Sequence, residues 1–185
     1  MINFTGNFIN YTDVLKRTPG IGYTKQKVAF VELDTTSPHD KKFINTIKNT
    51  WNCPMDFVKC MSDNFDILYK NQEELRLPRI FALTKQLDSF DKLDSSKALG
   101  LVQTNVNLKN NIDIELLQTN PLYINQDGRS DIRYIGSTIL DSIKEIFCGK
   151  KLTLFSTEDA LPFYLKNKFR PYNTTLNEQY LLYEA

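Results

Sequence analysis

The sequence predicts a mixed α/β fold in which helices pack on a single central sheet. The first observation is the order of patterned segments, which runs strand, two helices, three strands, helix, strand, helix, strand. The second is the strict alternation of apolar and polar residues over 112–116, which is typical of a strand with one buried face. The third is a set of apolar stripes at helical spacing, which indicates helices that bury one side.

Length and charge limit the classes of protein that fit. The chain has 185 residues, and 23 Lys and Arg against 22 Asp and Glu give a formal net charge of +1. This length predicts one domain, placed at 28–185, after a loosely structured N-terminal extension over 1–27 with room for one short strand. A protein that binds duplex nucleic acid usually shows a basic excess, so the balanced charge predicts no nucleic-acid partner. It also argues against a membrane anchor, and no apolar run approaches the roughly 18 residues of a membrane span.

The cysteine pattern indicates a reducing compartment. The chain has three cysteines, Cys53, Cys60 and Cys148, and one histidine, His39. Since they form no paired motif and no Cys/His cluster, the sequence predicts no metal site. The N-terminus also lacks the charged and apolar regions of a secretory signal. We therefore expect three reduced cysteines in a cytoplasmic protein.

In the first half of the chain, a compact apolar run at 28–33 predicts a strand. After it, Ser37 can cap a helix whose first turn holds Pro38. A second helix is predicted around 57–68 from its apolar stripe. The segments at 79–85 and 98–106 are predicted strands, separated by a polar loop.

In the second half, the alternation over 112–116 places Asp113 and Glu115 on one face of a strand. Leu117 breaks the alternation, which would suit a bulge or the end of pairing. Further on, apolar residues at 139–147 predict a helix that ends near Gly149. The remaining predicted elements are a strand at 151–155, a short helix at 159–168 and a final strand at 179–184.

Three motifs carry a resemblance to a known family. The segment ALPFYLKNKFRP at 160–171 is similar to A-x-x-F-Y-x-K-x-G-F, with Lys168 at the usual glycine position. The segment IELLQTNP at 114–121 is similar to a strand that ends in proline, and YLLY at 180–183 to a closing strand. With the element order, these motifs resemble the GNAT superfamily of N-acetyltransferases over about 28–185. The resemblance implies a mostly antiparallel central sheet flanked by about four helices.

The phosphate-binding loop of that family, R/Q-x-x-G-x-G/A, fits this sequence in two alignments. The first anchors on Arg133 and makes Gly136 the first glycine of the motif. The second makes Gly136 the last glycine and places Ile139 and the following leucine at the family's Leu-Leu pair. In this preferred alignment, Tyr134 replaces the first glycine and Asp131 replaces the arginine.

The resemblance implies acetyl-CoA as cosubstrate and no metal. Backbone amides at a helix start would hold the pyrophosphate, with Arg129 or Arg133 adding a charged contact; the amides concerned are those of Ile135, Gly136, Ser137 and Thr138. The pantetheine arm would lie along Leu117, Gln118 and Thr119 like an added strand.

The resemblance also implies catalytic roles. An N–H near Leu117 would stabilise the oxyanion, and Asp113 or Glu115 would take the proton of the attacking amine. Each of these carboxylates fits a solvated strand face equally well. Tyr164 matches the tyrosine that often protonates the departing thiolate, whereas its periodicity alone would make it a half-buried packing residue.

The leading hypothesis is an N-acetyltransferase that moves an acetyl group from acetyl-CoA to a primary amine by direct attack in a ternary complex. The expected acceptor is a small-molecule or peptide amine. No nucleic-acid or membrane partner is expected, and a homodimer is compatible with the sequence. The alternative is a catalytically inactive GNAT-like module that binds CoA or a protein partner. A third option is a relative that uses a different acyl donor or a charged tRNA.

Overall fold

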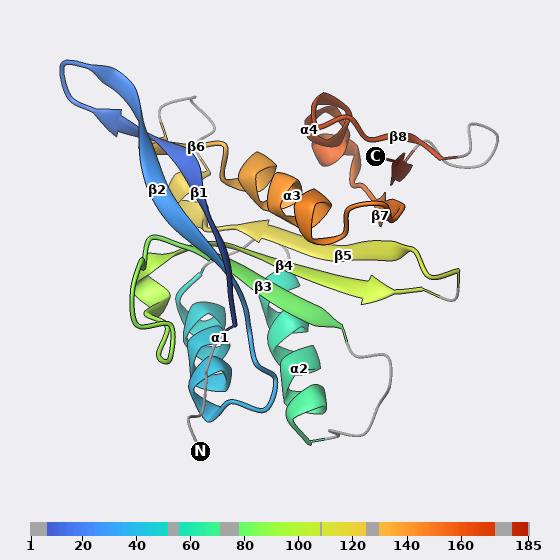
Figure 1. Ribbon diagram of the computed structural model, residues 1–185, viewed down its shortest axis with the longest axis horizontal. Coiled ribbons are helices and arrows are strands. Elements are labelled where there is room, and N and C mark those ends of the chain that lie inside the picture. Colours follow the sequence, from blue (N-terminus) through green and yellow to red (C-terminus); the bar gives the residue numbers. More distant parts are fainter. Residues whose placement is uncertain are drawn as a thin grey trace.

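A computed structural model of the chain describes residues 7–51, 56–70, 78–107, 109–124, 130–172 and 179–184. Figure 1 shows a single large sheet with helices on both of its faces. The nine strands of the described residues lie in the order β6-β1-β2-β3-β4-β5-β7-β9-β8. In this part of the chain, all neighbours are antiparallel except β5 and β7. This arrangement confirms the predicted mixed α/β fold with a mostly antiparallel sheet.

The bounds of the elements follow the predicted order, with additions at the N-terminus and around the loops. The strands are β1 (Asn7–Thr18), β2 (Gly22–Glu32), β3 (Arg79–Thr84), β4 (Ala98–Val106), β5 (Ile112–Thr119), β6 (Ile132–Arg133), β7 (Leu152–Phe155), β8 (Arg170–Pro171) and β9 (Tyr180–Tyr183). The helices are α1 (Pro38–Thr50), α2 (Phe57–Lys70), α3 (Ile135–Ile146) and α4 (Leu161–Lys166), with 3-10 turns η1 (Ser95–Lys97), η2 (Pro121–Tyr123) and η3 (Glu158–Ala160). None of the helices in the described segments is long and apolar enough to cross a membrane.

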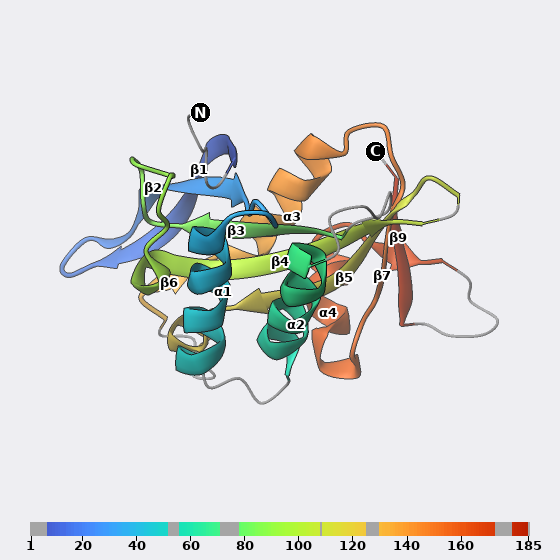
Figure 2. The ribbon, with the colours of Figure 1, turned by 90° about the horizontal axis from the view of Figure 1, so that it is seen from below.

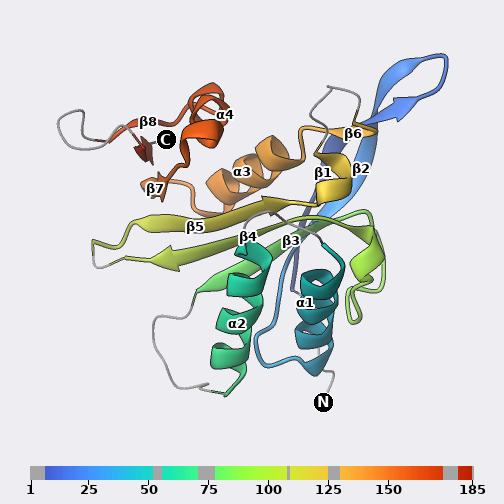
Figure 3. The ribbon, with the colours of Figure 1, turned by 180° about the vertical axis from the view of Figure 1, so that it is seen from behind.

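The helices divide the molecule into three layers. In the views from the front and from behind, α1 and α2 cover one face of the sheet, and α3 and α4 cover the other (Figures 1 and 3). Two separate apolar cores result. On β2, Ala29 and Val31 face the core under α1 and α2, whereas Val28 and Phe30 face the core under α3. Because both faces of β2 are covered, its sequence reads as a continuous apolar run rather than an alternating one.

The start of α1 forms as its sequence predicts. Ser37 is the N-cap residue, and its Oγ accepts a hydrogen bond of 3.2 Å from the backbone N–H of Asp40. Pro38 occupies the first turn, where its missing N–H has no helical partner in any case. The cap residue and the proline together fix where the chain turns from β2 into the helix layer.

The N-terminal segment differs from its prediction. Residues 1–27 were expected to be loosely structured, but β1 pairs with β2 from Asn7↔Glu32 to Thr18↔Gly22, so the segment is part of the sheet. The turn joins the strands at Pro19-Gly20, and Gly20 has φ 78°, which glycine adopts without strain. One short strand was allowed for, but β1 runs over 12 residues. Its length was missed because most of β1 is exposed or half-exposed, and only Val14 is fully buried. Whether the chain is one domain over 28–185 remains a prediction.

A β-bulge sits in the middle of β5. Leu116 pairs with Gln103 and Ile114 pairs with Thr104, so Glu115 is the extra residue. The broken alternation predicted a bulge or the end of pairing at Leu117; the bulge lies two residues earlier, and pairing with β4 continues to Thr119. Its effect on side chains is direct: Ile114 and Leu117 pack on the α3 side of the sheet, and Leu116 packs on the α2 side.

The bulge also reverses the direction of the backbone amides. Amides of successive strand residues point to opposite neighbours. The amide of Ile112 donates to Lys151 beside β7, yet that of Asn120, an even number of residues later, donates to Leu99 beside β4. Only an inserted residue between them makes both bonds compatible. Counting back from Asn120, the amides of Leu117 and Thr119 point away from β4.

The C-terminal end of α4 contains a residue under backbone strain. The amides of Lys168 and Phe169 donate to the carbonyls of Leu165 and Tyr164, respectively, which is the bonding pattern of a Schellman cap. In this cap Lys168 has φ 67°, in the left-handed region that favours glycine. Phe169 packs against the Tyr164 ring at 5.9 Å between centroids, which completes the cap.

The variant Lys168→Gly is expected to stabilise the protein by about 0.5–1 kcal/mol, because glycine adopts this φ without a clash at Cβ. Lys168→Ala is the matched control: it removes the same exposed side chain but keeps the strain, so it should bring no gain. Urea unfolding measures the free energy of unfolding of both variants and of the wild type, provided that the three m values agree. A glycine variant no more stable than the alanine variant would contradict the assignment of strain.

Candidate active site

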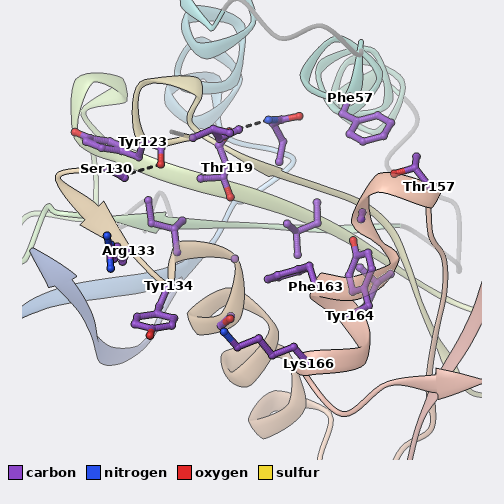
Figure 4. A pocket seen from close by; sticks show the side chains of 18 of the residues that line it. Phe57, Thr119, Tyr123, Ser130, Arg133, Tyr134, Thr157, Phe163, Tyr164 and Lys166 are labelled. Atoms are coloured by element: carbon purple, nitrogen blue, oxygen red, sulfur yellow. Dashed lines mark hydrogen bonds between the residues drawn. The ribbon is translucent and has the colours of Figure 1, made fainter. Parts of the chain in front are cut away.

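A cavity of about 740 Å³ lies between β5, the first turn of α3 and α4. Nine of the eleven predicted site residues line it: Glu115, Leu117, Gln118, Thr119, Arg133, Ile135, Gly136, Ser137 and Tyr164. Asp113 and Thr138 do not. Figure 4 shows Tyr123, Arg133 and Tyr134 on one side of the cavity and Phe57, Thr157 and Tyr164 on the other.

The cavity exists because β5 and β7 separate. Their parallel pairing covers only Ile112–Ile114 of β5, which face Leu152–Leu154 of β7. Among the described residues, no strand pairs with the β7 side of β5 beyond this point. Since the amides of Leu117 and Thr119 point to that side, the open edge presents backbone donors to the cavity. An extended ligand can pair with this edge as an added strand would.

The first turn of α3 presents a second group of backbone donors. The helix begins at Ile135, and its first helical bond runs from the amide of Thr138 to the carbonyl of Tyr134. The preceding amides in the turn therefore have no acceptor within the helix, and those of Ile135, Gly136 and Ser137 lie in the cavity lining. With the positive end of the helix dipole, this turn suits an anion such as a pyrophosphate.

Two residues hold this turn in place. Tyr134, the N-cap residue, has φ 65°, a conformation that favours the glycine it replaces in the preferred alignment. Gly136 lies so close to Phe163 of α4 that a Cβ would stand 2.9 Å from the ring. Thr138 lies outside the cavity, and its hydroxyl donates to the carbonyl of Asp13 at 3.2 Å, which ties α3 to β1.

Two positively charged side chains line the cavity together with the first turn of α3. Arg133 is exposed on β6, with its guanidinium 4.1 Å from the centroid of the Tyr23 ring. Lys166 of α4 lines the cavity together with the first turn of α3. Lys166 belongs to the motif at 160–171, but only the packing of α4 on α3 brings its side chain to the cavity. Arg129, which could also carry such a contact, lies outside the described residues.

The two predicted carboxylates have different surroundings. Glu115 lines the cavity at the end near Phe57. Its carboxylate accepts hydrogen bonds from the side-chain amides of Gln103 at 2.6 Å and Asn105 at 3.2 Å. Gln103 is in turn fixed by Asn64 of α2, whose amide donates to it at 3.1 Å. The bulge and this chain of amides together hold the Glu115 carboxylate beside the cavity.

Asp113 has a structural position instead. Its carboxylate accepts hydrogen bonds from Asn107 at 3.0 Å and from the hydroxyl of Thr153 on β7. These bonds join the β4–β5 turn, β5 and β7 at the paired end of the strands. The structure thus brings Glu115 to the cavity and leaves Asp113 among the bonds that close the sheet.

Tyr164 lies on α4 at the cavity wall, packed between Phe163 and Phe169. Burial raises its pKa to about 12, because a phenolate would lose its hydration among these rings. Tyr164 is therefore a neutral hydrogen-bond and proton donor at every pH at which the protein works.

Several lining residues were not among the predicted site residues: Phe57, Tyr123, Ile124, Ser130, Phe155, Thr157 and Phe163. They come from α2, η2, β7, α4 and the neighbouring loops, which approach β5 only in the folded chain. Tyr123 follows the Asn120-Pro121 turn, where the Asn120 side chain accepts from the amide of Leu122 at 3.0 Å. That Asn-Pro turn was the one sequence signal that could have pointed to Tyr123.

No family model matches the sequence, and no curated protein is similar to it. The fold, however, is similar to solved acetyltransferase structures. A variant of the toxin AtaT bound to the C-terminus of the antitoxin AtaR and acetyl-CoA matches with a TM-score of 0.57 at 13% identity, over 85% of this chain and 92% of that one. AtaT complexed with acetyl-methionyl-tRNAfMet matches with a TM-score of 0.56 at 12% identity, over 85% and 94%.

A putative acetyltransferase of the GNAT family from Desulfovibrio desulfuricans matches with a TM-score of 0.54 at 12% identity, over 85% of this chain and 98% of that one. At such identities the similarity establishes a shared fold. The expected GNAT-like architecture is therefore confirmed, and acetyl-CoA is bound in one of the similar structures.

The predicted partners need correction. The near-neutral charge predicted no nucleic-acid partner, and the acetyltransferase hypothesis predicted a small-molecule or peptide amine acceptor. AtaT, which shares this fold, was solved with a tRNA and with a segment of a protein antitoxin. Excluding nucleic acid on the basis of net charge is therefore wrong. The physical reason is that net charge sums over the whole surface and does not report a local cluster.

The raised pKa of Tyr164 makes a prediction about alkaline stability. The folded state keeps the phenol proton above pH 10, where an unfolded tyrosine loses it, so this stability is present below pH 10 and lost as the pH rises to about 12. We expect the free energy of unfolding to fall more steeply over this range in the wild type than in Tyr164→Phe. Urea unfolding at a series of pH values measures the difference, and parallel curves would contradict the burial of the phenol.

Proposed function

We propose that this protein transfers the acetyl group of acetyl-CoA to a primary amine by direct attack in a ternary complex. The observation that carries the proposal is the open edge of β5. It presents the amides of Leu117 and Thr119 to a cavity that has an anion-binding helix start at one end. A carboxylate, Glu115, and a neutral phenol, Tyr164, line the same cavity.

Binding of acetyl-CoA follows from the two groups of backbone donors. The pyrophosphate would accept hydrogen bonds from the first turn of α3, with Arg133 and Lys166 supplying positive charge nearby. The pantetheine arm would pair with the open edge of β5, which leads toward Glu115. The acetyl carbonyl would then lie near the amide of Leu117, which can stabilise the oxyanion of the tetrahedral intermediate.

The transfer itself needs one base and one acid. The neutral amine attacks the thioester carbonyl, so a C–N bond forms, the C–S bond breaks, and the amine proton passes to Glu115, directly or through water. The leaving thiolate takes the proton of Tyr164, which is regained from solvent. Because burial disfavours a phenolate as well as a thiolate, Tyr164 must regain a proton from solvent as the thiolate takes its own.

For the acceptor, we propose the amine of an aminoacyl-tRNA. The support is the shared fold with AtaT, which was solved in complex with acetyl-methionyl-tRNAfMet. Such an amine is aliphatic and primary, as direct attack requires, and it stands at the end of a single-stranded segment that can enter a cavity.

The phosphate site can be tested with Ser137→Asp. A carboxylate in the first turn of α3 should leave the stability of the free protein unchanged or slightly higher, because it complements the helix dipole. The same charge should repel the pyrophosphate and abolish the thermal shift caused by acetyl-CoA. In the wild type, ligand at about 100 times its Kd should stabilise the fold by about 2.7 kcal/mol.

The matched control is Ser137→Ala, which keeps the backbone donors and should keep the thermal shift. A full shift in Ser137→Asp would contradict the placement of the pyrophosphate. No shift in the wild type would contradict the proposal as a whole and favour a non-catalytic module.

The base can be tested with Glu115→Gln, which should lower kcat by about 10²–10⁴-fold while the acetyl-CoA thermal shift is retained. Asp141→Asn is the control, since it makes the same chemical change on an exposed carboxylate of α3. The assay follows labelled acetyl groups into methionyl-tRNA and release of free CoA. An activity of Glu115→Gln within threefold of the control would remove Glu115 from the mechanism.

A further inference from the structure

One face of the β1–β2 hairpin gathers positive charge. Residues on this face are identified by counting in steps of two from Ala29, which packs under α1. On β2 this gives Lys27, Lys25 and Tyr23. Opposite Tyr23 on β1 stands Arg17. The same register places Asp13 opposite Lys27 and Leu15 opposite Lys25. We call the hairpin face the surface made by Tyr11, Asp13, Leu15, Arg17, Tyr23, Lys25, Lys27 and, from the neighbouring strand β6, Arg133.

The net charge of the chain does not reveal the positive charge of the hairpin. Residues 11–27 hold four Lys and Arg and a single acid, Asp13, so they carry +3, and the rest of the chain carries −2. Asp13 lies 3.7 Å from Lys25, and both side chains are largely exposed. Exposed pairs of this kind are weak, so Lys25 stays available to another anion.

Tyrosine rings alternate with the cations. Lys27 lies 3.9 Å from the centroid of the Tyr11 ring, and Arg133 lies 4.1 Å from that of Tyr23. Cations interleaved with aromatic rings are the composition of surfaces that bind a nucleic-acid backbone and stack its bases. An acidic protein partner would need only the positive charges, whereas a nucleic acid can also stack its bases on the tyrosine rings.

The hairpin face continues into the cavity. Arg133 belongs to both, and the Tyr23 hydroxyl donates at 2.9 Å to the carbonyl of Ser130, which lines the cavity. Beyond them Tyr123 lines the same side and accepts a hydrogen bond of 3.0 Å from Lys85. Figures 1 and 2 show the hairpin extending from the sheet as an arm on the side of the molecule where β6 lies.

We propose that the hairpin face binds the phosphate backbone of an RNA and guides its single-stranded end, which carries the acceptor amine, into the cavity. The inference rests on the proposed function, since that function supplies the amine at the RNA end. Lys and Arg would contact phosphates and the tyrosine rings would stack on bases, and neither contact recognises base sequence. Binding should therefore depend strongly on salt and weakly on sequence.

The test measures RNA binding directly, without acetyl-CoA. The probe is fluorescently labelled, deacylated tRNA, and its Kd is measured by anisotropy over a series of salt concentrations. The double variant Lys25→Glu/Lys27→Glu should raise the Kd by about tenfold or more. It should also lower the slope of log K against log salt by about 2, roughly one for each lost phosphate contact.

The matched control is Lys109→Glu/Lys150→Glu, which makes the same charge change on exposed lysines in the two turns before β5 and β7, away from the hairpin. This control should keep the wild-type Kd within about threefold and its salt slope. Equal losses in the two double variants would overturn the proposal. So would binding of duplex DNA, or of an acidic peptide of equal charge, that is as tight as binding of tRNA.

The acetyl-CoA thermal shift separates this inference from the proposed function. Both double variants should keep the shift. A wild type that shows the shift but does not bind tRNA overturns the hairpin inference alone. A wild type that binds tRNA through the hairpin face but shows no shift supports the surface and overturns the proposed acetyl transfer.

Discussion

The single residue inserted at Glu115 is the constraint on which the candidate site depends. Before the bulge, β5 uses its outer amides to pair with β7, and after it the amides of Leu117 and Thr119 face an edge that β7 has left. A regular strand would direct these amides into β4 instead. The same insertion sets Glu115 beside the cavity, so one backbone irregularity places both the oxyanion donor and the proposed base.

Backbone geometry is retained at positions where the expected glycines are absent. Tyr134 and Lys168 stand at glycine positions of the two family motifs, and both have φ between 65° and 67°. When another residue replaces the glycine and tolerates the backbone strain, the sequence match to the motif becomes poorer, but the turn still forms. At these two turns the backbone conformation is therefore kept although the glycine is not.

The parts of the fold that could be predicted are those fixed by local chemistry. The Ser37 cap, the alternation at the start of β5 and the apolar stripe of α3 each need only neighbouring residues, and each is present. The strand β1 could not be predicted, because its pairing with β2 shields few of its side chains from solvent. Phe57 could not be predicted for another reason: only tertiary packing brings α2 to the cavity.

Charge shows the same division between local and global information. A net charge of +1 is a correct sum, but it cannot distinguish an evenly neutral surface from a basic arm on an acidic body. The register of the hairpin decides between them, because it places Lys25 and Lys27 on one face together with Arg17. Screening limits such interactions to about 8–10 Å at physiological salt, so a partner responds to this face and not to the sum. The β1–β2 hairpin therefore carries a local positive charge that the net charge of the chain does not reveal.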